Sequence, residues 1–164
     1  MKKEIITVNM GEYRVSKNPN MFKTILGSCV GVIIYDKVNK IGGLAHVYLP
    51  RSMDYKKNPK KNNYNLKYAD ILIPHMIREL VRNNGQKRYF ISYIIGGATL
   101  FNVKPNSVID IGRKNLEIVR EILRTEKITF FELHVGGKTG RKVIFNLSNG
   151  DISIKNLSKT TGII

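Results

Sequence analysis

The sequence contains little cysteine and few acidic residues, and these shortages exclude several classes of protein. Among its 164 residues there is one cysteine, Cys29, which excludes an internal disulfide framework and any multi-cysteine metal site. No stretch approaches the roughly 20 consecutive apolar residues that a membrane-spanning helix needs, so we expect no membrane insertion. We see no apolar run with a small-residue cleavage site near the start, and therefore expect no signal peptide and a cytoplasmic protein.

The shortage of acidic residues leaves a large positive charge. The chain has 28 Lys+Arg against 12 Asp+Glu, which gives a formal net charge of +16. Such a charge suits nucleic acid, an acidic protein surface or an anionic membrane. However, 19 of the basic residues are lysine and only 9 are arginine, whereas bidentate recognition of phosphates and bases favours arginine. A lysine-biased composition explains the charge as well, and without a binding motif we expect no nucleic-acid partner.

Hydrophobic residues make up 42% of the chain and occur throughout it, which is typical of a folded protein. There is no internal repeat and no low-complexity linker, so we expect residues 1–164 to form one domain. The segment 51–67 is rich in lysine and asparagine and contains Pro59, a composition typical of a solvated loop.

Apolar periodicity predicts two helices, over residues 69–82 and about 113–124, the second with basic residues toward solvent. Segments rich in Ile, Val, Phe and Tyr predict strands. These segments are residues 4–8, 22–26, 30–35, 41–49, 89–95, 129–135, 142–146 and 151–155. Many strands in runs with two helices indicate the α+β class with largely antiparallel sheets.

Cys29 lies between two predicted strands and is flanked by Gly27 and Gly31, which allow unusual backbone angles and close approach of a substrate. The strands 30–35 and 41–49 are joined by five polar residues, as in a hairpin. If Tyr35 pairs with Ile41, then Val30 lies opposite His46, and Cys29 is an adjacent or diagonal neighbour of His46. Alternatively, Cys29 is a small buried apolar residue and His46 a histidine satisfied within the sheet.

A cysteine beside a histidine can carry out nucleophilic hydrolysis. The imidazole takes the thiol proton, the thiolate attacks a carbonyl or carboxamide carbon, and backbone N–H groups stabilise the oxyanion. A third residue usually orients the imidazole, and the candidates are Thr24 and Ser28. His75 and His134 are expected to have structural roles, and the spacing of the histidines predicts no metal site and no cofactor.

Several short motifs follow one another along the sequence. Two of them are Leu26-Gly27-Ser28-Cys29-Val30 and Gly43-Leu44-Ala45-His46-Val47-Tyr48-Leu49-Pro50. Further motifs lie at residues 67–70, 95–101, 111–115, 136–137 and 140–143. Together, in this order and over essentially the whole chain, they resemble the motifs of the CheD family, the chemoreceptor glutamine deamidases of bacterial and archaeal chemotaxis.

This resemblance implies two packed β-sheets with helices on one side, as in bacterial toxins that deamidate glutamine. It implies that Cys29 is the nucleophile, His46 the general base and Thr24 the residue that orients His46. We expect Gly27, Ser28, Gly96 and Gly97 to bind substrate.

The implied substrate is a glutamine on the cytoplasmic helices of a methyl-accepting chemotaxis receptor, and the implied partner is a CheC-type phosphatase. The alternative is an adaptor without enzymatic activity that binds the receptor and the phosphatase. A methylesterase side activity is compatible with the same chemistry, and the lysines of 56–67 together with the second helix are candidates for steering the protein onto acidic receptor helices.

Overall fold

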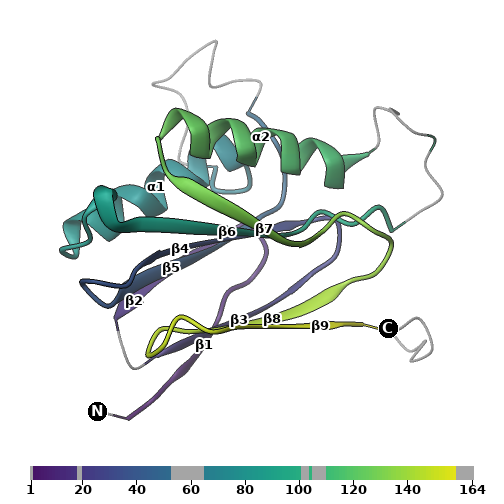
Figure 1. Cartoon of the computed structure of the whole chain (residues 1–164). Coiled ribbons are helices and arrows are strands. Elements are labelled where there is room, and N and C mark those ends of the chain that lie inside the picture. The colour runs from purple at the N-terminus through teal and green to yellow at the C-terminus, as the bar shows by residue number, and fades with distance from the viewer. Residues whose placement is uncertain (1, 18–19, 53–64, 101–103, 105–109, 158–164) are drawn as a thin grey trace.

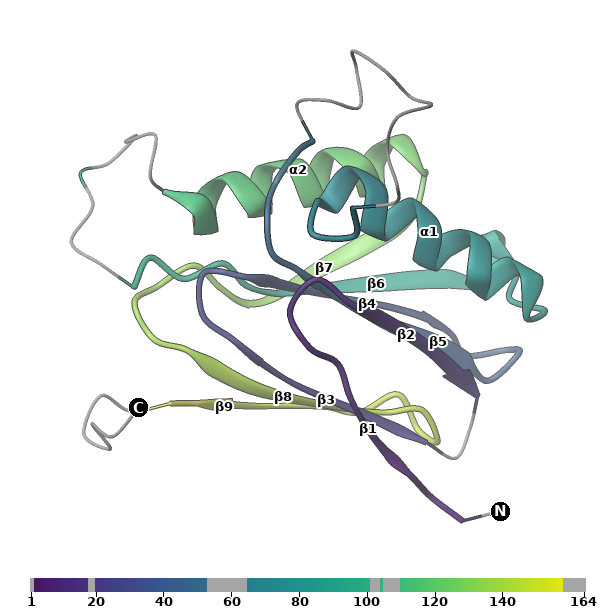
Figure 2. The same cartoon turned by 180° about the vertical axis from the view of Figure 1, so that it is seen from behind.

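The chain folds into three stacked layers. The computed structural model describes residues 2–17, 20–52, 65–100, 104 and 110–157. Within these residues, two α-helices lie on one face of a five-stranded sheet, and a four-stranded sheet covers the other face (Figure 1 and Figure 2). The expected α+β class, with two packed sheets and the helices on one side, is confirmed.

The two sheets are mostly antiparallel. In spatial order, the larger sheet contains β2 (Tyr13–Lys17), β5 (Ile41–Val47), β4 (Val30–Asp36), β6 (Phe90–Gly96) and β7 (Thr129–Val135). The smaller sheet contains β1 (Ile5–Thr7), β3 (Met21–Leu26), β8 (Arg141–Asn146) and β9 (Ile152–Asn156). Among these described strands only the pairs β1–β3 and β6–β7 are parallel.

Helix α1 (Ala69–Arg82) has the bounds that its apolar periodicity predicts. Its stripe is buried against the larger sheet and comprises Leu72, Ile73, Met76, Ile77 and Leu80. Pro74 is the sixth residue of the helix. Because proline has no N–H, the carbonyl of Asp70 lacks its usual partner within the helix.

Helix α2 (Ile111–Thr125) begins two residues earlier than predicted. The Asp110 carboxylate accepts a hydrogen bond from the backbone N–H of Arg113 at 3.2 Å, which caps the first turn. The stripe residues Leu116, Val119 and Leu123 are buried, as expected for an amphipathic helix.

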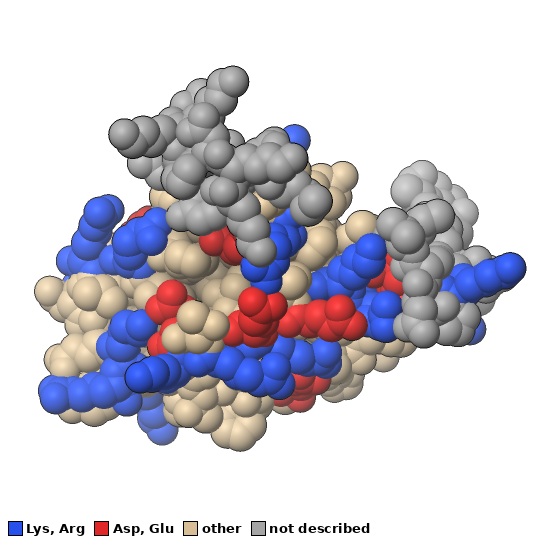
Figure 3. All heavy atoms as spheres, turned by 90° about the horizontal axis from the view of Figure 1, so that it is seen from above, with Lys and Arg blue, Asp and Glu red and all other residues tan. Residues whose placement is uncertain are grey.

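Acidic neighbours reduce the basic character expected of α2. Arg113 lies 3.8 Å from a carboxylate oxygen of Asp110 and 3.7 Å from one of Glu117, and Arg120 forms a bidentate pair with Glu132. Figure 3 shows acidic side chains among the basic ones on the helical face. The outer surface of α2 is therefore mixed in charge rather than a continuous basic face.

The hairpin of β4 and β5 is one residue tighter than predicted. Asp36 pairs with Ile41, so Tyr35 pairs with Gly42 and the expected pairing of Tyr35 with Ile41 is wrong. The Asp36 carboxylate accepts hydrogen bonds from the backbone and side chain of Asn39, which keeps Asp36 in the strand and closes a four-residue turn. Lys40 completes the turn at φ 54°, in the left-handed region.

Strand β2 has no counterpart in the sequence prediction. Its five residues include only two apolar side chains, Tyr13 and Val15, and both pack against the core beneath α1 as partly buried residues. Such a short alternating segment forms a strand because β5 supplies the edge on which it pairs.

Strand β4 separates two hydrophobic clusters. Val32 and Ile34 face the helices, whereas Ile33 and Tyr35 face the smaller sheet. Cys29, one residue before β4, belongs to the cluster between the sheets. Its side chain therefore points into the space between the two sheets, away from the helices.

Two further expectations concern membrane spans and the lysine-rich segment. No helix in the described part of the chain is long and apolar enough to cross a bilayer. Most of the predicted lysine-rich loop, residues 53–64, lies outside the described residues.

Candidate active site

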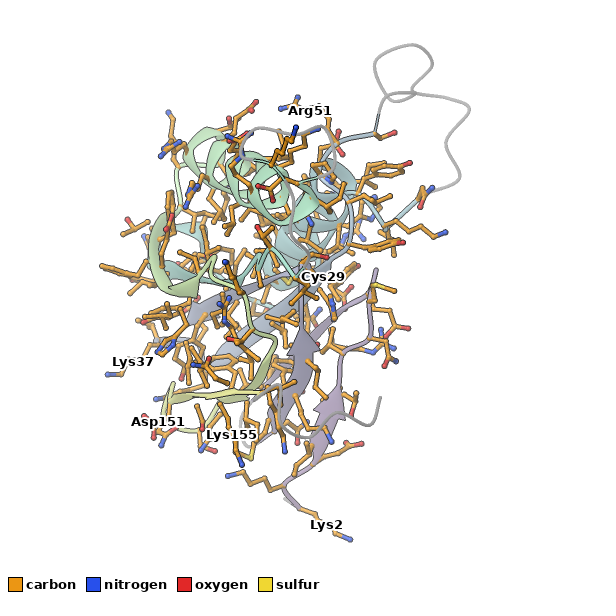
Figure 4. All side chains as sticks on the ribbon, turned by 90° about the vertical axis from the view of Figure 1, so that its right-hand side faces the viewer. Lys2, Cys29, Lys37, Arg51, Asp151 and Lys155 are labelled. Atoms are coloured by element: carbon orange, nitrogen blue, oxygen red, sulfur yellow. The ribbon has the colours of Figure 1, made fainter. Side chains whose placement is uncertain are left out.

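Three of the predicted site residues, Thr24, Cys29 and His46, face the space between the two sheets. Thr24 comes from β3 of the smaller sheet, and His46 comes from β5 of the larger sheet. The side chains are buried, with exposed fractions of 2% for Thr24, 6% for Cys29 and 5% for His46. Figure 4 shows Cys29 below the helices, at the level where the two sheets face each other.

The corrected register places Cys29 diagonally from His46. Gly31, not Val30, lies opposite His46, and Cys29 is two residues before Gly31. Residues directly opposite each other point to the same face of a sheet, and diagonal neighbours have Cβ atoms within roughly 8 Å, which is within reach of an imidazole. Gly31 has no side chain, and the Leu26 side chain occupies the space there, since a Cβ atom at Gly31 would lie 2.9 Å from Leu26 Cδ1.

A hydrogen bond joins Thr24 to His46. The Thr24 Oγ1 lies 2.8 Å from His46 Nδ1 and also 2.8 Å from the carbonyl oxygen of Val8. The Val8 carbonyl can only accept, so the Thr24 hydroxyl donates its hydrogen bond to Val8. The Thr24 oxygen in turn accepts a hydrogen bond from His46 Nδ1–H. This assignment leaves Nε2 unprotonated and able to accept a proton.

The local sequence explains why Thr24 points inward and why the imidazole is held in place. In β3 the buried side chains alternate, with Phe22, Thr24 and Leu26 facing the other sheet. On the side of β5 that faces away from β4, the backbone of His46 makes two hydrogen bonds. Its N–H donates to the carbonyl of Glu12, and its carbonyl accepts from the N–H of Gly11. The segment before β2 therefore fixes the strand that carries the imidazole.

The turn before Cys29 is hydrogen-bonded to a second glycine-rich segment, residues 96–98. Gly97 N–H donates to the Cys29 carbonyl at 2.8 Å, and Ala98 N–H donates to the Gly27 carbonyl at 3.0 Å. Gly96 has φ +99°, and a Cβ atom there would lie 2.6 Å from the Cys29 carbonyl oxygen. Glycine is therefore required at position 96 for this close approach.

Burial keeps the cysteine and the histidine uncharged at neutral pH. Desolvation raises the pKa of the Cys29 thiol to about 11. Desolvation also lowers the pKa of His46, although the Val8 carbonyl and the charge of Glu12 act in the opposite direction. The resting pair is thus a thiol and a neutral imidazole, and a thiolate would form only if the thiol proton were transferred to an acceptor such as the imidazole.

A hollow of about 390 Å³ opens beside the imidazole. Its walls are residues 7–10 and 23–25 together with His46. Ile25 and Met10 are exposed apolar side chains at this hollow, and Lys23 adds a positive charge. The lining suits a substrate with apolar and acidic groups.

The remaining predicted residues fall into two groups. Ser28 makes no side-chain contact with His46 among the described hydrogen bonds, so of the two candidates Thr24 is the one that contacts the imidazole. His75 lies on α1, and His134 is exposed in β7 with φ 51°. No group of three or more His, Cys, Asp or Glu side chains in the described residues could hold a metal ion.

Two polar residues near Cys29 were not singled out from the sequence. Asn115 of α2 is fully buried and donates from Nδ2 to the carbonyls of Ser28 and Tyr48 at 3.3 Å and 3.1 Å. The feature of the sequence that could have indicated Asn115 is a polar residue on the apolar stripe of a helix, next to Leu116.

Arg141, the first residue of β8, is also buried. Its Nη2 donates to the Gly136 carbonyl, while Nε and Nη1 have no hydrogen-bond partner among the described residues. Desolvation lowers its pKa. Since Gly136 N–H in turn donates to the Gly96 carbonyl at 2.8 Å, Arg141 supports the glycine-rich segment behind Cys29.

Comparisons with known proteins agree on one family. A sequence model described as CheD chemotactic sensory transduction matches residues 48–156. A Methanococcus vannielii protein is 36% identical over 152 residues, which cover 92% of this chain and 94% of the relative. A Clostridium botulinum protein is 35% identical over 94% of each chain, and a Desulforamulus reducens protein is 36% identical over 97% of this chain and 95% of the relative. Each relative is named probable chemoreceptor glutamine deamidase CheD. The chain therefore belongs to the CheD family.

Proposed function

We propose that this chain is a protein-glutamine deamidase that converts glutamine to glutamate on the cytoplasmic helices of methyl-accepting chemotaxis receptors. The observation that carries the proposal is the hydrogen bond from His46 Nδ1 to Thr24, which leaves Nε2 free on the face that Cys29 shares. The names of the relatives supply the reaction and the substrate class.

In the first half of the reaction, His46 Nε2 takes the proton of the Cys29 thiol as the sulfur attacks the carboxamide carbon of glutamine. The resulting tetrahedral oxyanion is stabilised by backbone N–H groups of the turn at residues 27–29. When this intermediate collapses, His46 gives its proton to the leaving nitrogen, and ammonia departs. The product is a thioester between Cys29 and the former glutamine side chain.

In the second half, water replaces ammonia. His46 takes a proton from the water as its oxygen attacks the thioester carbon, and the collapse of the second intermediate breaks the carbon–sulfur bond. The sulfur regains a proton and glutamate is released. Thr24 keeps the imidazole in one orientation and one tautomer throughout, because its oxygen accepts from Nδ1.

The proposed substrate path uses the glycine-rich turns. Gly27 and Ser28 precede the nucleophile, and Gly96 and Gly97 lie directly behind it, so a glutamine side chain that reaches the sulfur passes close to these backbones. The hollow beside His46 would accept the neighbouring residues of the receptor helix.

We also propose that the protein acts in the cytoplasm and binds a CheC-type phosphatase as well as the receptor. A glutamyl methyl ester would fit the same mechanism, with methanol leaving in place of ammonia.

The experiment that separates an enzyme from an adaptor is peptide mass spectrometry of a receptor fragment incubated with the protein. Deamidation replaces a side-chain amide by a carboxyl group and adds about 1 Da at each modified glutamine. We expect this gain at defined glutamines only when the protein is present. Receptor binding without any gain would favour the adaptor and contradict the proposal.

A further inference from the structure

We propose that Asn115 is a positioning residue that holds the turn of Cys29 at a fixed distance from the strand of His46. The inference rests on the proposed cysteine mechanism. It concerns a residue on the helical layer, which touches neither Thr24 nor the imidazole by a hydrogen bond.

The need for such a residue follows from where the β4–β5 ladder stops. The last pair is Val30 with Val47, so continuation of the register would bring Cys29 opposite Tyr48. Cys29 lies outside the strand, and beyond this point no ladder bond between β4 and β5 is present in the described residues. The nucleophile therefore sits on a segment that the sheet itself does not tie to β5.

Asn115 supplies the missing connection. Both hydrogens of its amide are used, one toward the Ser28 carbonyl at 3.3 Å and one toward the Tyr48 carbonyl at 3.1 Å. Ser28 precedes the nucleophile by one residue, and Tyr48 follows the base by two. A single rigid amide thus spans the two chain segments whose separation sets the distance from sulfur to imidazole.

The burial of this amide indicates that the two hydrogen bonds have a purpose. Asn115 is 0% exposed on the apolar stripe of α2, and its Oδ1 has no hydrogen-bond partner within the described part of the chain. A buried acceptor without a partner is unfavourable, but an apolar residue of similar size would instead leave the carbonyls of Ser28 and Tyr48 without this donor. The opposite amide orientation would place three acceptor oxygens together, so the observed orientation is the one that donates to both carbonyls.

The matched pair of variants is Asn115→Leu and Val119→Ala. Leucine keeps similar volume but removes both donated hydrogen bonds. Val119 is buried on the same stripe of α2, one turn further on, and its truncation loosens the helix without touching Ser28 or Tyr48. Both full-length variants are compared by thermal unfolding, by deamidation kinetics on a receptor fragment, and by alkylation of Cys29 with iodoacetamide across pH.

Because misplacement of reacting groups by about 1 Å can cost roughly 100-fold, we expect Asn115→Leu to lower kcat by roughly 10-fold or more with KM nearly unchanged. We also expect it to lose the part of the alkylation profile that disappears in His46→Ala. Val119→Ala should keep that profile and most of kcat at a similar loss of thermal stability. Equal effects of the two variants, or a wild-type profile in Asn115→Leu, would overturn the proposal.

A second variant covers the case in which Asn115→Leu does not fold. Asn115→Asp keeps the shape of the side chain but has at most one proton for the two carbonyls, so it should also lose kcat and the His46-dependent alkylation. An Asn115→Asp protein with wild-type values would overturn the inference. Activity that persists in Cys29→Ala would instead remove the proposed mechanism, so the two failures are distinguishable.

Discussion

Replacement of Thr24 by valine tests how the imidazole is held. Valine has nearly the same shape as threonine but lacks the hydroxyl, so the change removes the 2.8 Å contact with His46 Nδ1 and the 2.8 Å contact with the Val8 carbonyl. Thr24 is 2% exposed, and a water molecule from the hollow beside it would not fix the ring as a side chain held in β3 does. His46 then loses the group that fixes its ring.

The size of the effect follows from the charge that His46 gains during the reaction. When the imidazole accepts the thiol proton it becomes an imidazolium, and the bond from Nδ1–H to Thr24 becomes charge-assisted. Hydrogen bonds to charged groups contribute about 1.5–3 kcal/mol, which corresponds to roughly 10- to 150-fold in rate. We expect kcat to fall by this factor in Thr24→Val, with little change in KM because Thr24 positions the base.

The assay is ammonia release from a receptor fragment, with Thr24→Ser as the matched control. Serine retains the hydroxyl, so it should stay within about threefold of wild type, an effect smaller than one hydrogen bond. If Thr24→Val is as active as wild type, the hydroxyl does not orient the base. If Thr24→Ser is as impaired as Thr24→Val, packing of the methyl group explains the loss.

Three further predictions concern pH and salt. Burial lowers the pKa of His46, so the acid limb of the pH profile of kcat/KM should lie below about pH 6.5, the usual pKa of histidine. An acid limb above that pH would contradict this assignment of His46. Burial alone would raise the pKa of Asp36, but hydrogen bonds from Asn39, Gln86 and Val38 lower it overall. A depressed carboxyl pKa stabilises the fold above the unfolded-state value, so the free energy of unfolding should fall as pH drops below about 4, and Asp36→Asn should flatten this dependence in urea titrations. If the lysines steer the protein onto acidic receptor helices, added salt should slow deamidation of an acidic receptor fragment more than that of a small neutral glutamine peptide. Equal slowing of both substrates would mean that the net charge of +16 has no role in docking.

Periodicity was sufficient to predict the helices, because each of them buries one face against the larger sheet. Most strands could be predicted from their Ile, Val, Phe and Tyr content, because the central strands are buried on both faces between the two hydrophobic clusters. Helix α1 matches its apolar stripe to the residue. The hairpin register was wrong by one residue because the Asp36 side chain binds Asn39 and shortens the turn, an interaction that alternation of apolar residues does not reveal. Strand β2 was missed because its pairing with β5, rather than its composition, makes it a strand.

The site was predictable to the extent that it lies on neighbouring segments. A hairpin brings Cys29 and His46 close in any register that a short turn allows, and the alternation in β3 points Thr24 the same way as its buried neighbours. The contribution of Asn115 depends on how the helical layer packs on the sheet. That contact joins segments nearly ninety residues apart in the chain, and no local pattern encodes it.

The most direct test of the central claim is ammonia release by Cys29→Ala, measured beside wild type and a control, Ser92→Ala. Ser92 is buried in β6 and its hydroxyl has no hydrogen-bond partner among the described residues, so its loss should leave activity near wild type. The account predicts no ammonia above background from Cys29→Ala, with thermal unfolding and receptor binding retained. Full activity in the folded Cys29→Ala protein would contradict it.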